Sequence, residues 1–276
     1  MIIEKVLKSN DNMAVKYQLR LDDNNVIESL YVNYYNKHII CYSSQVGCVM
    51  GCRICNNGVN ANYIRNLTAE EIEEQCEMII NNININFEKP ILFSCMGIGE
   101  PLLNISNLAP AIKKLALKYP KAKFALATTA VIPEKILELV DILLPIDIKV
   151  TISLHASNDN IRKKIIPNLE NIKKILEVRQ IYNDKYNKDF EWNYVLLNDI
   201  NDSESSAYEL ANLLGKNSNI KINKFNIIDN CKFKESAEEK KKRFIDILIK
   251  ESLNVEQYET NGSDIMGACG QMRIKK

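Results

Sequence analysis

The chain has 276 residues, 46% of them hydrophobic, so it can bury the core of one large α/β domain or of two small ones. Its formal charge of +1, from 36 Lys and Arg against 35 Asp and Glu, provides no overall positive field that would by itself indicate a nucleic-acid partner. The sequence has neither a run of about eighteen apolar residues nor a basic and then apolar leader, so we expect a soluble cytosolic protein and no membrane partner.

The amino-terminal part shows the alternation of a β-hairpin. Residues 13–43 alternate polar and apolar side chains on both sides of the bend Asp-Asp-Asn-Asn at 22–25. This pattern predicts two antiparallel strands joined by a turn. We expect them to form a β extension over residues 1–40, followed by a single structural unit over 41–276.

Four of the eight cysteines follow within fifteen positions, as Cys41, Cys48, Cys52 and Cys55. In a reducing compartment such a cluster indicates metal binding or chemistry rather than structural disulfides. The CxxxCxxC spacing of the last three fits an iron–sulfur cluster with one iron left open for a ligand. Structural zinc needs four closed ligands, and Cys41 would be an awkward fourth. The spacing favours iron, although it does not exclude zinc.

From residue 68 onward, helical patterns alternate with short apolar runs rich in β-branched residues. This rhythm predicts βα units around a parallel sheet. The capping-box patterns TAEE at 68–71 and SAEE at 236–239 predict helices that run to about residues 80 and 253. The expected strands lie at about 38–43, 90–96, 123–128, 147–153, 191–197 and 220–226. They predict an α/β fold, a partial (β/α)6-type barrel with its chemistry at the carboxyl ends of the strands.

Glycines and polar strand ends indicate where the site lies. Eight of the nine glycines fall in three segments: Gly47, Gly51 and Gly58; Gly97 and Gly99; Gly262, Gly267 and Gly270. Glycine is needed where the backbone turns sharply or approaches a ligand, so we expect these segments to converge. After the second expected strand, CMGIGEPLLN offers Gly99 and Glu100, whose carboxylate suits an ammonium group. Another strand ends in SLHA, which places Ser153 and His155 at the same rim, although His155 alone is better explained as a structural residue.

In combination, the CxxxCxxC, GEP and SLH segments resemble the radical S-adenosylmethionine (SAM) superfamily. More narrowly, SSQVGCVMGCRIC, RNLT, MGIGEPLLN, SLHASND and the terminal ACGQ look like the adenine methylases of ribosomal and transfer RNA, the RlmN and Cfr group. The similarity runs from about residue 10 to 272 and so covers almost the whole chain. We therefore expect a radical SAM barrel without the amino-terminal RNA-recognition domain of that family.

The resemblance implies two cofactors. Cys48, Cys52 and Cys55 would bind a [4Fe-4S] cluster, and SAM would coordinate its open iron. Glu100 would bind the amino group of SAM. The other residues implied in the cofactor site are Gly99, Thr129, Ser153, His155 and Asn226. An electron donor such as flavodoxin or ferredoxin would reduce the cluster, and SAM would then be cleaved to a 5′-deoxyadenosyl radical.

The resemblance also implies that two cysteines carry out the methylation. Cys269, in ACGQ, would take a methyl group from one SAM, and a radical from a second SAM would activate that methyl group. The resulting carbon radical would add to an adenine ring carbon of RNA, carbon 2 rather than carbon 8. Cys41 would then remove a proton and close a disulfide with Cys269, which releases the methylated base. Glu28 aligns with a family glutamate near the base, with a solvated strand charge as the alternative.

Several positions depart from the family pattern. Ile54 replaces an aromatic residue, and the segments at 127–130 (ATTA) and 224–227 (KFNI) differ from the family's STSG and PWNP-like sequences. SAM binding is still expected, whereas these departures leave the identity of the substrate, ribosomal or transfer RNA, open. The alternatives are the same chemistry on another substrate and a non-catalytic zinc-binding module, which would have no use for the distant Cys269. We expect a monomer in which Cys76, Cys95 and Cys231 are inert.

Overall fold

The computed structural model describes residues 1–60, 62–258 and 261–273. The strands of its large sheet are β1 (Ile2–Lys8), β2 (Ala14–Arg20), β3 (Val26–Tyr34), β4 (Lys37–Cys41), β7 (Ile91–Cys95), β8 (Lys123–Thr128), β9 (Ile148–Ser153), β10 (Glu191–Val195), β11 (Asn219–Asn223) and β12 (Asn254–Tyr258). They are ordered β1-β2-β3-β4-β7-β8-β9-β10-β11-β12. β1 to β4 pair antiparallel, and the pairs from β4–β7 to β11–β12 are parallel.

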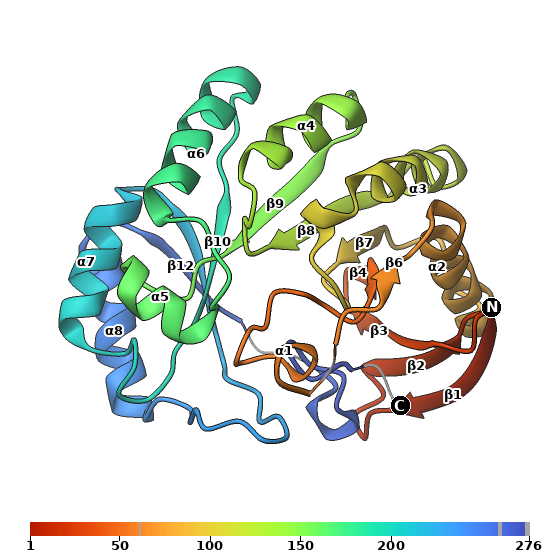
Figure 1. Ribbon diagram of the computed structural model, residues 1–276, viewed down its shortest axis with the longest axis horizontal. Coiled ribbons are helices and arrows are strands. Elements are labelled where there is room, and N and C mark those ends of the chain that lie inside the picture. Colours follow the sequence, from red (N-terminus) through yellow and green to blue (C-terminus); the bar gives the residue numbers. More distant parts are fainter. Residues whose placement is uncertain (61, 259–260, 274–276) are drawn as a thin grey trace.

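The helices are α1 (Asn56–Asn60), α2 (Ala69–Ile83), α3 (Ile105–Lys118), α4 (Glu134–Leu143), α5 (Asp159–Ile165), α6 (Ile172–Tyr186), α7 (Glu204–Leu214) and α8 (Glu238–Lys250), with the 3-10 helices η1 (Pro101–Leu103) and η2 (Ser263–Ile265). Two short strands, β5 (Gln45–Val46) and β6 (Arg65–Asn66), form a second sheet. Figure 1 shows the large sheet curving into an incomplete ring, with α2, α3, α4, α6 and α7 outside it. The predicted partial barrel preceded by a β-hairpin is confirmed.

The main hydrophobic core lies between the strands and the helices. Phe93 and Trp192 belong to it, together with helix residues such as Leu108. Successive side chains of a strand point to opposite faces, so Ser94 and Asn193 point to the interior of the ring. One face of the parallel sheet therefore stabilises the fold, while the other presents polar groups.

The hairpin and the barrel share one sheet. β3 pairs with β4 from Leu30↔Cys41 to Tyr34↔Lys37, and β4 pairs in turn with β7. The expected division at residue 40 falls inside β4 and stays a prediction. Cys41 thus ends the strand that joins the two parts.

Two strands of the large sheet, β1 and β12, were not expected, and neither were the short strands β5 and β6. β1 is mostly exposed, and β12 has no buried residue. Both lie at the ends of the sheet, where a strand needs no buried apolar face. Neither sequence therefore shows the apolar pattern by which the other strands were predicted.

The capping-box prediction is right for α2 and wrong for α8. In α2, Thr68 is the N-cap and exchanges hydrogen bonds with Glu71. In α8, Ala237 is the N-cap and makes no side-chain capping bond, because Ser236 Oγ donates instead to Asp202 Oδ2 at 2.7 Å. The Asp202 carboxylate, from a loop distant in sequence, thus binds the Ser236 hydroxyl that the local pattern predicted to cap the helix.

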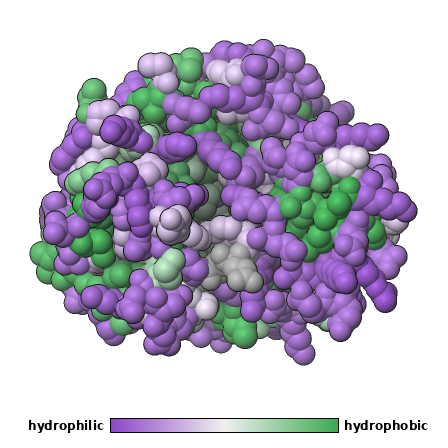
Figure 2. Space-filling view, turned by 180° about the vertical axis from the view of Figure 1, so that it is seen from behind, coloured by the Kyte–Doolittle hydropathy of each residue, from purple (hydrophilic) through white to green (hydrophobic). Residues whose placement is uncertain are grey.

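Figure 2 shows the reverse side of the molecule, where hydrophilic residues predominate and hydrophobic ones gather in separate patches. Scattered apolar side chains of this kind are usual on folded proteins. Among the described helices, none combines the length and the apolar character that a membrane span requires.

We predict that Thr68→Ala lowers the free energy of unfolding by about 1 kcal/mol, because it removes the acceptor of the Glu71 N–H in the first turn of α2. Thr68→Ser keeps a hydroxyl at the cap and should stay close to the wild type. Urea denaturation of the three proteins measures the difference. Equal losses in the alanine and serine variants would show that the cap is not what stabilises this end of α2.

Candidate functional site

The three cysteines of the CxxxCxxC motif lie together in the loop between β5 and α1. The pKa of the Cys52 thiol is raised well above its usual value, first by burial and then by the nearby thiols of Cys55 and Cys48. Burial likewise raises the pKa of Cys48 to about 12. Gly58 allows the loop to fold back on itself, because a Cβ there would lie 2.1 Å from the carbonyl oxygen of Cys52.

Three thiols in one loop are the type of ligand that an iron–sulfur cluster takes. In the described part of the chain, no three His, Cys, Asp or Glu side chains are placed to hold one metal ion. In a [4Fe-4S] cluster, each cysteine binds a different iron, so the three sulfurs surround the metal atoms instead of converging on one point. Their raised pKa values mean that the free thiols are protonated at neutral pH, and metal binding releases those protons.

Glu100 lies in a closed cradle of hydrogen-bond donors at the carboxyl end of β7. Its side chain is 2% exposed and accepts from the Thr129 N–H at 2.9 Å, the Thr129 hydroxyl at 2.8 Å and the Leu102 N–H at 3.2 Å. The Thr128 hydroxyl also donates to it. Burial nevertheless raises the pKa of Glu100, because desolvation of the carboxylate outweighs these donors. A cation beside Glu100 would favour its ionised form.

Gly99 allows the backbone next to Glu100 to lie against the start of the cysteine loop. Its φ is +115°, and a Cβ there would lie 2.6 Å from the Ser44 hydroxyl oxygen. Gln45 Oε1 accepts the Glu100 N–H at 2.8 Å. The structure therefore places Gly99, Glu100 and Thr129 together, and their contact with SAM stays a prediction.

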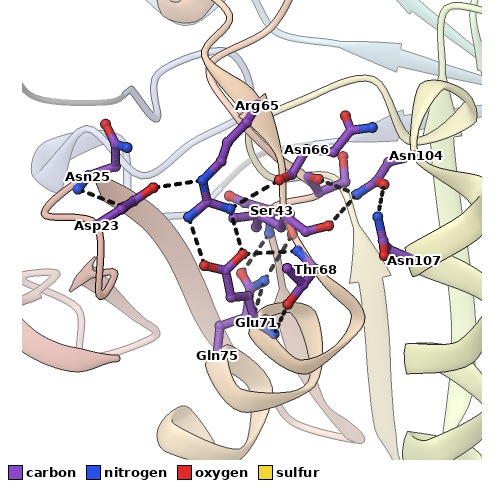
Figure 3. Close-up of polar contacts among 12 residues, drawn as sticks. Asp23, Asn25, Ser43, Arg65, Asn66, Thr68, Glu71, Gln75, Asn104 and Asn107 are labelled. Carbon is purple, nitrogen blue, oxygen red and sulfur yellow. Dashed lines mark hydrogen bonds and ion pairs between the residues drawn. The ribbon is translucent and has the colours of Figure 1, made fainter.

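A polar network supports the exit of the same loop (Figure 3). Arg65 forms a bidentate pair with Glu71, with N–O distances of 2.7 and 2.8 Å. Asn66 Oδ1 accepts from Gln45 Nε2 at 2.8 Å, and Asn66 Nδ2 donates to the Leu103 carbonyl at 3.1 Å. The network thus fixes Gln45, which in turn holds the backbone of Glu100.

The SLHA segment follows β9. Ser153 pairs in register with Asn193 on the inner face of the ring. His155 has a φ of +57°, and its Nδ1 accepts the Val195 N–H at 3.2 Å. Burial lowers the pKa of His155 to about 3, so the ring is neutral at physiological pH. The structure thus places His155 as a hydrogen-bonded strand-end residue, and a contact of His155 with a cofactor stays a prediction.

The carboxyl-terminal ACGQ segment lies directly on the cysteine loop. The Asn56 N–H donates to the Gly270 carbonyl at 2.7 Å, and Asn226 Nδ2 donates to the Cys269 carbonyl at 3.1 Å. Gly270 has a φ of +81°, and a Cβ there would lie 2.7 Å from the Ile54 carbonyl oxygen. The expected convergence of the three glycine segments is therefore found.

Cys41 and Cys269 approach each other from opposite ends of the chain. Cys41 packs against a small apolar cluster that includes Leu30 and Met272, the latter from the carboxyl-terminal segment. Burial raises the pKa of Cys41 to about 12, and the charge of the Cys269 thiolate contributes to the increase. Cys269 is exposed, but the protein around its sulfur desolvates the thiolate and raises its pKa, with a further contribution from Cys55. The segment that carries Cys269 therefore packs beside Cys41.

Glu28 is not a solvated strand charge, and that alternative is wrong. Its side chain is 1% exposed and pairs with Lys16 at 3.2 Å. It also accepts from Gln18 Nε2 at 2.8 Å and from the Arg273 N–H at 3.0 Å. Glu28 thus connects β3 to the segment that carries Cys269.

The ring interior also contains polar atoms that lack a partner. In the described residues, Asn193 Oδ1 and Asn223 Oδ1 are buried without a hydrogen bond. They lie on the adjacent strands β10 and β11, on the face that carries Ser153 and the Cys41 neighbour Ser94. Buried acceptors normally have a partner, so a polar cofactor bound in the ring fits these residues.

Sequence reasoning missed several residues that organise the site. Asn56 and Asn57 were hidden in a chain rich in asparagine, and Asn57 Nδ2 donates to the Met272 carbonyl at 2.6 Å. Arg162 stands beside Lys163 and Lys164, and such a basic run is typical of a solvated helix face, yet Arg162 is fully buried. The only local feature that connects Arg162 with the site is its position four residues after the SLHASN segment. Of the cysteines expected to be inert, Cys76 and Cys95 are buried.

Comparison with known proteins agrees with this geometry. Residues 42–211 match the model of the Radical SAM superfamily. The dual-specificity RNA methyltransferase RlmN of Wigglesworthia glossinidia brevipalpis is 37% identical over 276 residues, which cover 94% of this chain and 70% of that protein. A probable dual-specificity RNA methyltransferase RlmN of Clostridium beijerinckii is 34% identical over 98% of this chain and 77% of its own length.

A solved structure agrees as well. The crystal structure of a radical SAM methyltransferase from Sphaerobacter thermophilus superimposes with a TM-score of 0.89 at 26% identity. The match covers 99% of this chain and 81% of that one. The family match over more than half of the chain and the similarity to curated relatives over most of it show that this protein belongs to the radical SAM superfamily and, within it, to the RlmN-type methyltransferases.

Proposed function

We propose that this enzyme methylates an adenine ring carbon of RNA, carbon 2 rather than carbon 8, through an S-methylated Cys269. The observation that carries the proposal is that the segment bearing Cys269 packs through Met272 into the same apolar cluster as Cys41, while Asn56 binds this segment to the three-cysteine loop. The RNA substrate is supported by the relatives, which are named dual-specificity RNA methyltransferases. A cytosolic monomer that accepts electrons from a flavodoxin- or ferredoxin-like donor completes the proposal.

The three-cysteine loop and the ring hold the cofactors of the superfamily, a [4Fe-4S] cluster and SAM. When bound, they supply one electron, a methyl group and a carbon-centred radical. In the proposed site, Cys48, Cys52 and Cys55 are the ligands of the cluster. Glu100 pairs with the ammonium of SAM, which offsets the desolvation that raises its pKa in the free protein. The remaining contacts of SAM come from Ser153, Asn226 and their neighbours Gly99, Thr129 and His155.

Cys269 and Cys41 divide the chemistry between them. An adenine ring carbon is not nucleophilic, so it cannot take a methyl group by simple displacement, and a radical route avoids that difficulty. Sγ of Cys269 first accepts the methyl group, and this carbon, after loss of a hydrogen atom, bonds to the adenine. Cys41 would then take the ring proton, while the unpaired electron of the adduct would pass to the cluster. The sulfur of Cys41 would next bond to Sγ of Cys269 as the bond between Cys269 and the transferred carbon breaks. The electron pair of that bond stays on the carbon, which takes up the proton that Cys41 had carried and becomes the methyl group. Glu28 has a supporting role here, because it positions the segment that carries Cys269.

Two alternatives are less well supported. A zinc-binding module without catalysis conflicts with membership of a methyltransferase family and gives no role to Cys269. The same thiol chemistry on a substrate other than RNA agrees with the geometry, and it differs from the proposal only in the molecule that is methylated. Experiments on iron, on the product and on Cys41 separate these possibilities.

Protein prepared and reconstituted without oxygen should be brown and contain about four irons per chain. Cys48→Ala should lose most of this iron, because it removes a cluster ligand. Cys231→Ala is the matched control, since Cys231 Sγ donates to the Arg53 carbonyl in the same loop but has no expected role as a ligand. Iron and zinc analysis of the three proteins measures the difference. One zinc per chain in place of iron would favour the binding module.

Reconstituted enzyme incubated with methyl-deuterated SAM, a reductant and total cellular RNA should yield deuterated 2-methyladenosine. Nucleoside mass spectrometry with both methyladenosine standards identifies the position. Labelled 8-methyladenosine would move the reaction to the other ring carbon. Reductive cleavage of SAM with no labelled nucleoside in any RNA would favour a substrate other than RNA.

Cys41→Ala should accumulate a covalent complex between protein and RNA, because the adduct on Cys269 then lacks the thiol that resolves it. Cys269→Ala should form neither the complex nor methylated RNA. Denaturing gel electrophoresis with radiolabelled RNA reveals the complex. Full methylation by the Cys41 variant, with only free RNA on the gel, would remove Cys41 from the reaction.

A further inference from the structure

Arg162 of α5 has a side chain that is 0% exposed. Its Nη2 donates to the carbonyl oxygens of Thr129 at 2.7 Å and Ser153 at 3.2 Å. Its Nε and Nη1 donate to the carbonyls of Leu154 at 3.2 Å and Glu170 at 3.3 Å. All four hydrogen bonds of this guanidinium in the described residues thus go to the backbone. Three of them go to residues at the ends of β8 and β9.

Thr129 connects Arg162 to the cradle of Glu100. Its carbonyl accepts from Arg162, while its N–H and its hydroxyl both donate to Glu100 Oε2. A shift of the Thr129 backbone would therefore move two donors of the carboxylate at once. Ser153, the other residue held by Arg162, stands on the next strand at the same rim.

The shape of the guanidinium matters for this arrangement. Arginine presents five N–H donors in a planar fork, whereas lysine has three donors on one rotatable nitrogen. A lysine at position 162 would keep a positive charge, but its single nitrogen could not also donate to the Leu154 and Glu170 carbonyls, which Nε and Nη1 of the arginine reach. The charge also opposes the rise that burial causes in the pKa of the nearby Cys52 thiol, which gives an electrostatic role as the competing explanation.

We propose that Arg162 is a positioning residue that holds Glu100 and Ser153 in the geometry required by SAM, by fixing the backbone carbonyls at the ends of β8 and β9 through its hydrogen-bonding fork. The inference rests on the proposed role of Glu100 as the partner of the SAM ammonium. It extends that role to a residue that does not itself contact SAM.

The test compares SAM binding in Arg162→Lys and Arg162→Met, measured by equilibrium dialysis of reconstituted protein, with iron content and thermal unfolding recorded for each sample. Both variants should bind SAM about tenfold more weakly, as is typical when a residue that orients a ligand is lost, and should keep wild-type iron content. Arg162→Lys with wild-type affinity for SAM would overturn the proposal, because the charge alone would then suffice.

Arg179 supplies a matched control. It is also a largely buried arginine, and it donates to the Leu214 carbonyl at 2.7 Å and the Ser218 hydroxyl at 2.8 Å, away from Glu100. Arg179→Lys should lower the unfolding temperature without changing the affinity for SAM. A loss of affinity as large as that of Arg162→Lys would make the effect one of general stability and would overturn the proposal.

Two further variants keep the test decisive if the Arg162 variants unfold. Thr129→Val removes one donor of Glu100 while leaving Arg162 in place, and it should also weaken SAM binding; wild-type affinity would break the proposed connection. Glu100→Gln separates this inference from the proposed role of Glu100. Wild-type SAM binding in Glu100→Gln would refute that role, whereas weak binding there with normal binding in Arg162→Lys would refute only the inference about Arg162.

Discussion

The site depends on how the carboxyl-terminal segment is attached to the cysteine loop. Residues 269–272 have no strand partner, so their carbonyl groups need other donors. Asn226, Asn56 and Asn57 supply these donors through side-chain amides and, for Asn56, also through the backbone N–H. Without them, the carbonyl groups of residues 269–272 would lose these donors, and contacts such as that of the Arg273 N–H with Glu28 would have to hold the segment. With them, the segment lies beside both the cysteine loop and Cys41.

The sheet divides stability and chemistry between its two faces. The outer face packs Phe93 and Trp192 against the helices, and this core maintains the ring. The inner face carries polar groups whose burial is unfavourable unless they are paired. Arg162 is paired with carbonyl dipoles and Glu100 with hydroxyl and amide donors, whereas Asn193 retains a buried oxygen with no partner in the described residues. The interior of the ring is therefore specialised for a polar ligand.

The predictions from sequence were most accurate where a pattern is local. The six parallel strands, the hairpin around residues 22–25 and the cap at Thr68 depend on neighbours along the chain, and all three are confirmed. Strand ends indicated Gly99 and Glu100, whereas Thr129 was implied by the family resemblance alone, and the contact of all three with SAM stays a prediction. Partners that are distant in sequence could not be predicted. Ser236 bonds to Asp202 instead of capping α8, and Glu28 is buried by contacts with Gln18 and Arg273 that only the folded sheet creates.

The close contact at Gly270 restricts how this protein can change during evolution. The glycine has a left-handed backbone, and its α-carbon faces the Ile54 carbonyl with no room for a methyl group. Any other residue would have to push the cysteine loop and the terminal segment apart. Mutational drift should therefore retain glycine here even in lineages where the surrounding surface diverges, because no nearby compensating substitution can remove a backbone atom.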